Sequence, residues 1–214
     1  MRPVHDLPDD LALPLVRGDA WWYWLGGRPA LDLVNTLRER WRRRVETLVT
    51  PADLEAWLVR AGLPLDPGVG RPSTVTDGVL EEARALREAI DLCVTATLAS
   101  APPPPEAVAH IDAWLTHAGA RPQFALDAAG IPRLGERRAA DSPRRALAAI
   151  ALDAAEMLGR PEERARVRVC ASETCSARFY DRSPAGRRRW CSMRACGNEE
   201  KARRHRARTR SRVA

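Results

Sequence analysis

The sequence predicts a mainly α-helical protein with a small cysteine-containing module at its C-terminal end, and three observations lead to this fold class. Apolar residues recur at spacings of three and four along several segments, which is the period of a helix with one buried face. Residues that favour helix starts and helix ends flank these segments. Four of the five cysteines lie within the 27 residues from Cys170 to Cys196. We therefore expect a helical domain over residues 1–160 and a separate module over residues 165–214.

The helices of the N-terminal domain are predicted one after another from these patterns. The first runs from Pro29 to Leu48, because six apolar residues recur along one face of it. Thr50, with Asp53 three residues later, is typical of a capped helix start, and Gly62 is expected to end that second helix. Further helices are expected over residues 77–100, with Thr74 in the capping pattern, 106–117 and 142–158, and a short β-hairpin over residues 122–134.

Charge is distributed unevenly along the chain. Residues 160–214 contain 17 basic and 6 acidic residues, a net charge of +11, whereas the whole chain carries +7, so residues 1–159 carry −4. An acidic body with a strongly basic end is expected when that end meets a polyanion. A solvated tail without a partner is the alternative interpretation of the same charge run.

The overall composition indicates a folded protein of the cytoplasm. Hydrophobic residues make up 45% of the chain, enough for a packed core. No apolar run approaches the roughly 18 residues of a membrane span, so no span is expected. The first ten residues are acidic and lack the basic start and apolar stretch of a secretory signal. In the cytoplasm thiols stay reduced, so paired disulfides are not expected.

The four C-terminal cysteines have the spacing of a metal site. Cys170 and Cys175 are separated by four residues, fifteen residues follow, and Cys191 and Cys196 repeat the four-residue spacing. Two close pairs joined by a short arm can supply four thiolates to one tetrahedral ion, and soft thiolates favour zinc. A segment with so few apolar side chains needs such an ion, which contributes roughly 10–16 kcal/mol in small modules. An iron–sulfur cluster or four unrelated free cysteines are the alternatives.

The residues between and after the cysteine pairs predict the rest of the module. Arg178–Asp181 is expected to form a strand, residues 182–186 a turn, and Arg188–Trp190 a returning strand. Ser192 can cap a helix that begins near Met193 and runs into the tail. The predicted order is therefore a knuckle, a β-hairpin and a helix that carries the second cysteine pair. The fifth cysteine, Cys93, falls on the apolar face of a predicted helix and is expected to be a small buried side chain.

The module resembles the CGNR zinc finger family. Four stretches carry the resemblance: Phe179-Tyr180-Asp181-Arg182-Ser183, Arg188-Arg189-Trp190-Cys191-Ser192-Met193, Cys196-Gly197-Asn198 and Lys201-Ala202-Arg203. The segment Gly26-Gly27-Arg28-Pro29-Ala30-Leu31-Asp32-Leu33-Val34-Asn35-Thr36 resembles the opening of the ABATE domain, which precedes the finger in that family. The resemblance implies a stress-induced bacterial transcription regulator with one structural zinc ion, a DNA-binding finger and a helical domain that senses a ligand. Glu199 stands where the family has arginine. If that arginine contacts phosphate, the contact is lost here and replaced by repulsion; if it pairs with a neighbouring acid, the helix is rearranged locally.

The basic end suggests how duplex DNA would be bound. As a helix it has positive charge on nearly every face, so it would repel itself in water and be stabilised by phosphates. The residues expected to contact phosphate are Arg203, Arg204, Arg206, Arg208 and Arg210, with Arg187, Arg188 and Arg189 holding the backbone alongside. Base reading would fall to Arg194, Asn198 or Lys201 near the helix start. Trp190 is expected to pack over the metal site.

The N-terminal domain offers a candidate ligand pocket. Asp32, Asn35 and Thr36 lie close in sequence to Gly26-Gly27 and to the aromatic cluster of residues 21–24. They could bind a small-molecule effector, or they could brace the neighbouring turn while the aromatics form core. No catalytic set is recognisable, so we do not expect an enzyme.

Three rival functions stay open at this point. The chain could be an RNA- or ribosome-associated zinc protein, an enzyme on a small molecule with an accessory finger, or a protein-binding zinc module. The helical domain would be either the sensor or the dimerisation domain of a regulator. A homodimer is common among regulators, although no coiled-coil heptad supports one here.

Overall fold

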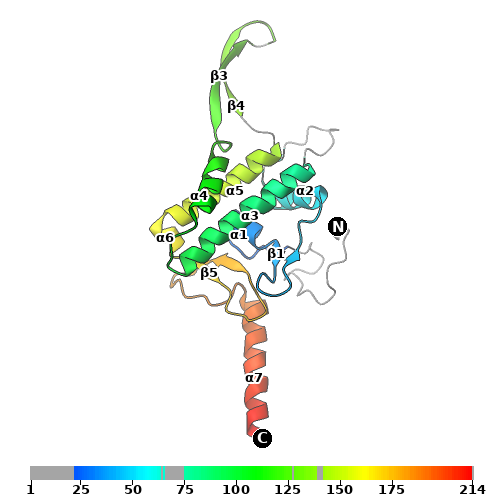
Figure 1. The fold of residues 1–214 in the computed structure, drawn as a ribbon, viewed down its shortest axis with the longest axis vertical. Coiled ribbons are helices and arrows are strands. Elements are labelled where there is room, and N and C mark those ends of the chain that lie inside the picture. Colours follow the sequence, from blue (N-terminus) through cyan, green and yellow to red (C-terminus); the bar gives the residue numbers. More distant parts are fainter. Residues whose placement is uncertain (1–21, 64, 66–74, 127, 139–141, 214) are drawn as a thin grey trace.

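The structure, a computed structural model, describes residues 22–63, 65, 75–126, 128–138 and 142–213. Within these residues the chain is mainly helical, as predicted (Figure 1). The helices are α1 (Pro29–Val34), α2 (Pro51–Arg60), α3 (Asp77–Leu98), α4 (Pro105–Leu115), α5 (Ser142–Gly159), α6 (Pro161–Arg164), the π-helical turn η1 (Met193–Gly197) and α7 (Asn198–Val213). The strands form three antiparallel pairs: β1 (Leu37–Arg38) with β2 (Val45–Glu46), β3 (Ala120–Leu126) with β4 (Pro132–Arg138), and β5 (Val167–Val169) with β6 (Arg178–Tyr180).

One hydrophobic core lies among α1 to α5. Its largest fully buried side chains come from α1, α2, α3, α5 and the segment before α2, and they include Trp57, Ile90 and Leu147. The aromatic cluster contributes to this core: Trp22 is buried, and Trp24 stacks on Trp57 with ring centroids 5.6 Å apart. Trp21 lies outside the described residues. Cys93 is buried on α3, as its place on the apolar face predicts.

The helix boundaries follow the expected start and stop signals. The Thr50 hydroxyl accepts a hydrogen bond from the Asp53 N–H at 3.3 Å, and the Thr50 N–H donates to the Asp53 carboxylate at 2.8 Å. Gly62, with φ of 68°, follows the end of α2 in the left-handed conformation that favours glycine. The predicted capping residue Thr74 lies outside the described residues, and Thr76 caps α3 by accepting a bond from the Val79 N–H at 3.4 Å.

The predicted helix from Pro29 to Leu48 is wrong beyond its first turns. Helix α1 ends at Val34, and the chain turns back through the β1–β2 pair, with positive φ at Glu39 (49°) and Arg44 (53°). Leu37 and Val45 of the two strands and Leu48 beyond them are buried, so most of the apolar residues that suggest a helix reach the core from two short strands and the segment after them. Trp41, in the turn between the strands, is 50% exposed and does not. Charged side chains in this turn are also buried. Glu39 pairs with Arg43 four residues on, whereas Arg40 pairs with residues of α3, a contact that local sequence cannot reveal.

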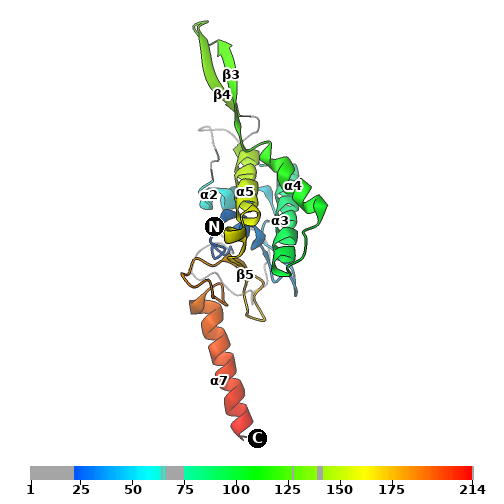
Figure 2. The ribbon, with the colours of Figure 1, turned by 90° about the vertical axis from the view of Figure 1, so that its left-hand side faces the viewer.

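The molecule is elongated, with projecting elements at both ends (Figures 1 and 2). The β3–β4 hairpin extends from the body at one end, paired from Ala120 opposite Arg138 to Leu126 opposite Pro132. It confirms the hairpin predicted over residues 122–134 and is longer at its base. Helix α7 extends from the opposite end. In the part of the chain that the structure describes, no helix is long and apolar enough to cross a membrane.

Candidate metal centre and basic helix

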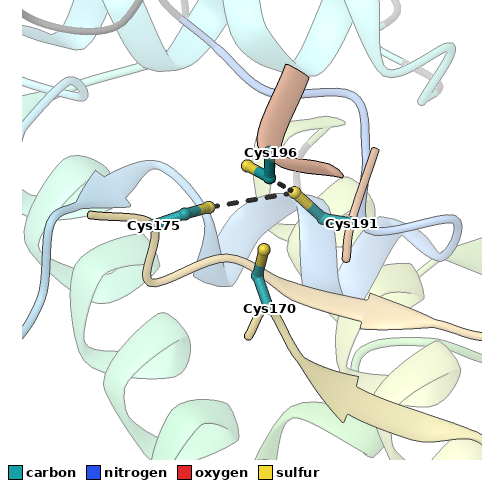
Figure 3. A group of neighbouring side chains, drawn as sticks. All are labelled: Cys170, Cys175, Cys191 and Cys196. Carbon is teal, nitrogen blue, oxygen red and sulfur yellow. Dashed lines mark hydrogen bonds between the residues drawn. The ribbon is translucent and has the colours of Figure 1, made fainter. Parts of the chain in front are cut away.

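The four C-terminal cysteines converge on one point (Figure 3). Cys170 follows β5, and its N–H donates to the Ala177 carbonyl at 2.9 Å, which closes the loop that carries Cys175. Cys196 lies in η1, where the Ser192 hydroxyl accepts a bond from the Ala195 N–H at 3.3 Å, as its predicted capping role requires. The four sulfur atoms all lie within 4.8 Å of one another, and all four residues are buried.

The sulfur positions fit a tetrahedral zinc ion. With Zn–S bonds of about 2.3 Å, the edge of a regular tetrahedron of sulfurs measures about 3.8 Å. The Cys175–Cys191 and Cys191–Cys196 sulfur pairs are 3.8 and 3.7 Å apart. None of the four forms a disulfide. The chain therefore holds one structural Zn²⁺ through Cys170, Cys175, Cys191 and Cys196.

The charge balance of the site points to the same cation. Hydrogen bonds from Cys175 and the other two thiols lower the pKa of Cys170. The corresponding bonds with Cys170 and Cys175 raise the pKa of Cys191. Four adjacent sulfurs therefore cannot all ionise by themselves, and a bound dication supplies the charge that makes them thiolates.

The strand order of the module differs from the prediction. Strand β6 is present at Arg178–Tyr180, but its partner is β5, which precedes Cys170, and not the segment Arg188–Trp190. The latter segment runs without a strand partner beside the first knuckle, where the Arg189 carbonyl accepts a bond from the Ala171 N–H at 2.8 Å. Strand β5 pairs with β6 because Val167 of β5 is buried in the main helical core. The spacing of the cysteines gives no sign of that contact.

Buried Asp181 fixes the loop between the cysteine pairs. Its carboxylate accepts bonds from the backbone N–H groups of Ser183 at 2.9 Å and Arg188 at 2.8 Å. The Arg188 guanidinium then donates to the Cys191 carbonyl at 2.7 Å and lies over the Phe179 ring. Arg188 thus braces the metal loop in addition to any role toward DNA. Trp190 packs against the cysteine cluster, as expected.

Helix α7 begins at the metal site and leaves the body (Figures 1 and 2). It continues directly from η1, so that Cys196 anchors its start. Buried Glu200 receives two bonds of 2.9 Å from Arg203, and Arg203 also pairs with Glu173 of the first knuckle at 3.0 Å. Arg203, predicted as a phosphate contact, therefore also fastens the helix to the module. Glu199, the residue that departs from the family pattern, is exposed in the first turn.

The other predicted nucleic-acid residues gather around the same end of the molecule. Six of them are exposed: Arg187, Arg189, Arg194, Asn198, Lys201 and Arg206. Arg204, Arg208 and Arg210 lie on α7. The structure therefore brings the loop arginines and the helix into one C-terminal module.

Comparison with known families identifies the two parts of the chain. The ABATE family, described as "putative stress-induced transcription regulator", matches residues 27–161. The CGNR zinc finger matches residues 166–209. The chain belongs to the ABATE family. The two families are a regulator and a zinc finger rather than enzyme families, and comparison with curated proteins found no match.

The CGNR finger docks tightly on the ABATE domain through backbone hydrogen bonds. The Asn35 side chain donates to the Arg178 carbonyl at 2.9 Å and accepts from the Arg178 N–H at 2.8 Å. The Tyr180 N–H donates to the Gly26 carbonyl at 2.7 Å, and the Arg40 N–H donates to the Ser176 hydroxyl at 3.0 Å. Strand β6 is thereby held against the end of α1, and the two parts form one continuous packed unit.

A buried charge network joins the same two parts. Arg178 of the finger pairs with Asp91 of α3 at 2.9 Å, and Arg40 pairs with Asp91 at 3.2 Å and with Glu88 at 2.8 Å. The side chains of Arg40 and Arg178 are only 6% and 7% exposed, and Arg178 also lies over the Trp41 ring. The sequence analysis did not predict this network, because single charged residues in separate segments carry no periodic or motif signal that would join them.

The candidate pocket residues all have partners within the chain. Asn35 is 4% exposed and bound to Arg178, as described above. Asp32 accepts a bond from the Gly26 N–H at 2.8 Å, and Thr36 donates to the Leu33 carbonyl at 2.7 Å. Burial raises the pKa of Asp32 to about 7, although the Gly26 bond opposes this rise. These contacts brace α1 and the finger. That these three residues also bind an effector stays a prediction.

Proposed function

We propose that this ABATE protein is a DNA-binding transcription regulator in which zinc fixes the start of a basic reading helix. The observation that carries the proposal is α7, a 16-residue helix that leaves the body at the zinc site. From Lys201 to Arg212 it carries seven lysine and arginine residues and no acid. The ABATE domain would act as the sensing body and would respond to a small-molecule effector.

The dimensions and charge of α7 suit a DNA groove. A helix of this length spans about 24 Å, and the major groove of B-DNA, about 12 Å wide, accepts an α-helix. Arginines three and four residues apart repel one another along α7, and phosphates on both groove walls would relieve that repulsion. Exposed Arg194, Asn198 and Lys201 are nearest to the anchored start and are proposed to reach base edges.

The docked arrangement would transmit a signal from the ABATE domain to DNA. Asn35, Arg40 and Asp91 belong to the ABATE domain and hold residues of the finger. An effector that shifts α1 or α3 would therefore move the finger and α7 with it. Such a regulator would act in the cytoplasm, where bacterial DNA lies.

The test is a salt titration of binding to duplex DNA. If α7 makes four to seven phosphate contacts, log Kd against log salt should have a slope of about 4 to 6, since each contact contributes about 0.9. An Arg206→Gln/Arg208→Gln variant, which removes two of the expected phosphate contacts, should lower that slope by about 2. The matched control, Arg42→Gln/Arg160→Gln, removes two exposed charges outside the finger and should leave the slope unchanged.

A second variant tests the role of zinc. Cys191→Ser/Cys196→Ser should lose sequence preference, because the helix start is no longer held. Equal slopes for the α7 variant and its control would contradict the proposal. Tighter binding to structured RNA than to duplex DNA would favour the RNA-associated rival, and binding insensitive to salt would favour a protein partner.

A further inference from the structure

The β3–β4 hairpin, residues 120–138 and here called the arm, has an apolar face in water. Phe124 and Leu134 are each 76% exposed, and Leu126 is 68% exposed. The register places Phe124 opposite Leu134 and Leu126 opposite Pro132. Because paired residues and alternate residues of a strand share a face, these four side chains form one side of the ribbon.

Such an arm is poorly suited to stand alone. A two-stranded ribbon is at best marginally stable in water, and contiguous exposed apolar side chains commonly mark an interaction site. The views in Figures 1 and 2 agree that the arm leads away from the helical body. Its apolar face is therefore not covered by the described part of its own chain.

The same chain carries an apolar cleft on its body. A cavity of about 230 Å³ lies between α3, α4 and α5, lined by Cys93, Val108, Ile111, Leu115 and Leu158. Val108, one of these lining residues, is 47% exposed. A cavity of about 150 Å³ already holds a benzene-sized group, so this one can take a phenylalanine ring. The cleft and the arm thus have matching chemistry.

Charge indicates which surface the arm fits. Residues 120–138 contain four arginines and two acids, a net charge of +2. Residues 100–119, which include α4, contain Glu106 and Asp112 and neither lysine nor arginine, a net charge of −2. Two arms would therefore repel each other, whereas an arm and the α4 side of the cleft attract.

We propose that the partner of the arm is a second copy of this chain, with each arm lying on the α3–α4–α5 cleft of the other copy. The exchange is reciprocal, so the assembly closes as a twofold dimer. Phe124, Leu126, Ile131 and Leu134 together expose about 500 Å², taking about 200 Å² for a large apolar residue. Two arms and the two surfaces they cover would bury up to about 2,000 Å², which is the size of a stable interface.

The experiment measures mass in solution by light scattering over a range of concentrations of the full zinc-loaded chain. The wild type should be a dimer at micromolar concentration. Phe124→Ser/Leu134→Ser on the arm and Val108→Asp at the cleft should each weaken the dimer at least 100-fold. The control is Val59→Ser on α2, a comparably exposed apolar residue (59%) outside both surfaces, which should dimerise like the wild type. Zinc content and circular dichroism check that each variant is folded.

Mixing the variants separates the arm–cleft contact from other arrangements. An arm variant and a cleft variant together retain one intact contact, so the mixture should form dimers at concentrations where neither variant does alone. A monomeric wild type, an arm variant that dimerises normally, or a control that fails to dimerise would overturn the proposal. A cleft variant that dimerises normally would overturn the place of the contact. The arm proposal does not depend on DNA binding by α7. An arm variant that is monomeric but still binds DNA with a salt-dependent Kd would support both proposals, whereas loss of only one of the two properties identifies which proposal fails.

Discussion

Replacing Asn35 by alanine tests whether the finger and the ABATE domain behave as one packed unit. The substitution removes the two bonds of 2.8 and 2.9 Å that join the Asn35 amide to the backbone of Arg178. Asn35 is 4% exposed, so the Arg178 N–H and carbonyl would be left buried without these partners. Each such orphaned group costs about 1–3 kcal/mol, and we expect a total loss of about 3–4 kcal/mol in the free energy of unfolding. For a chain of this size that loss corresponds to a fall of about 10 °C in Tm.

Two measurements check this prediction. Urea unfolding followed by tryptophan fluorescence reports the free energy, and transfer of zinc to a colorimetric chelator without denaturant reports opening of the finger. Asn35→Ala should release zinc faster, because β6 is no longer held on α1. Asn35→Asp, which has the same shape but sets an oxygen against the Arg178 carbonyl, should also destabilise the protein.

A matched asparagine provides the control. Asn198 is exposed on α7 and makes one long bond of 3.4 Å to the Arg194 carbonyl, so Asn198→Ala should change stability by less than about 0.5 kcal/mol. If Asn35→Ala were equally mild, or if it lowered Tm without changing zinc release, the inference that these bonds couple the two parts would be refuted.

Two further predictions concern zinc and pH. Chelating zinc, or substituting Cys191→Ser, should unfold the finger while α2 to α5 stay helical. The reason is that the core of the finger consists largely of the four cysteines. A circular dichroism spectrum that shows no loss of structure would contradict this prediction. Because burial raises the pKa of Asp32 to about 7, the folded state keeps a proton that the unfolded chain releases near pH 4. The stability contributed by Asp32 is therefore fully present below about pH 4 and is lost as the pH rises through 7. Asp32→Asn should therefore match the wild type near pH 4 and exceed it at pH 8 by on the order of 4 kcal/mol in the free energy of urea unfolding. Parallel pH profiles of the two proteins would exclude this role for Asp32.

The local features of this protein could be predicted where neighbouring residues alone decide the structure. Thr50 and Asp53 start α2, Gly62 follows its end, and Ser192 caps η1, because each bond in these caps joins residues at most four positions apart. The four zinc ligands were also predictable, since a metal site needs only donor type and spacing. The hairpin predicted over residues 122–134 was also recognisable from neighbouring residues alone. Its exposed apolar face was not predicted.

Other features depended on contacts between distant segments. The break after Val34 follows from Asn35 binding Arg178, which lies 143 residues away. The choice of β5 rather than Arg188–Trp190 as the partner of β6 follows from the burial of Val167 in the helical core. The fold also joins three charged residues that lie far apart in the sequence into one buried network, in which Asp91 pairs with both Arg40 and Arg178.

The sequence by itself therefore determined the helical class, the zinc ligands and the basic character of the C-terminal end, because periodicity, spacing and charge are properties of the chain alone. The tertiary structure decided how the finger is fastened to the ABATE domain, which arginines brace the protein, and where apolar surface is left exposed. Those outcomes depend on the packing free energy of residues that meet only in the folded chain, and no local pattern encodes it.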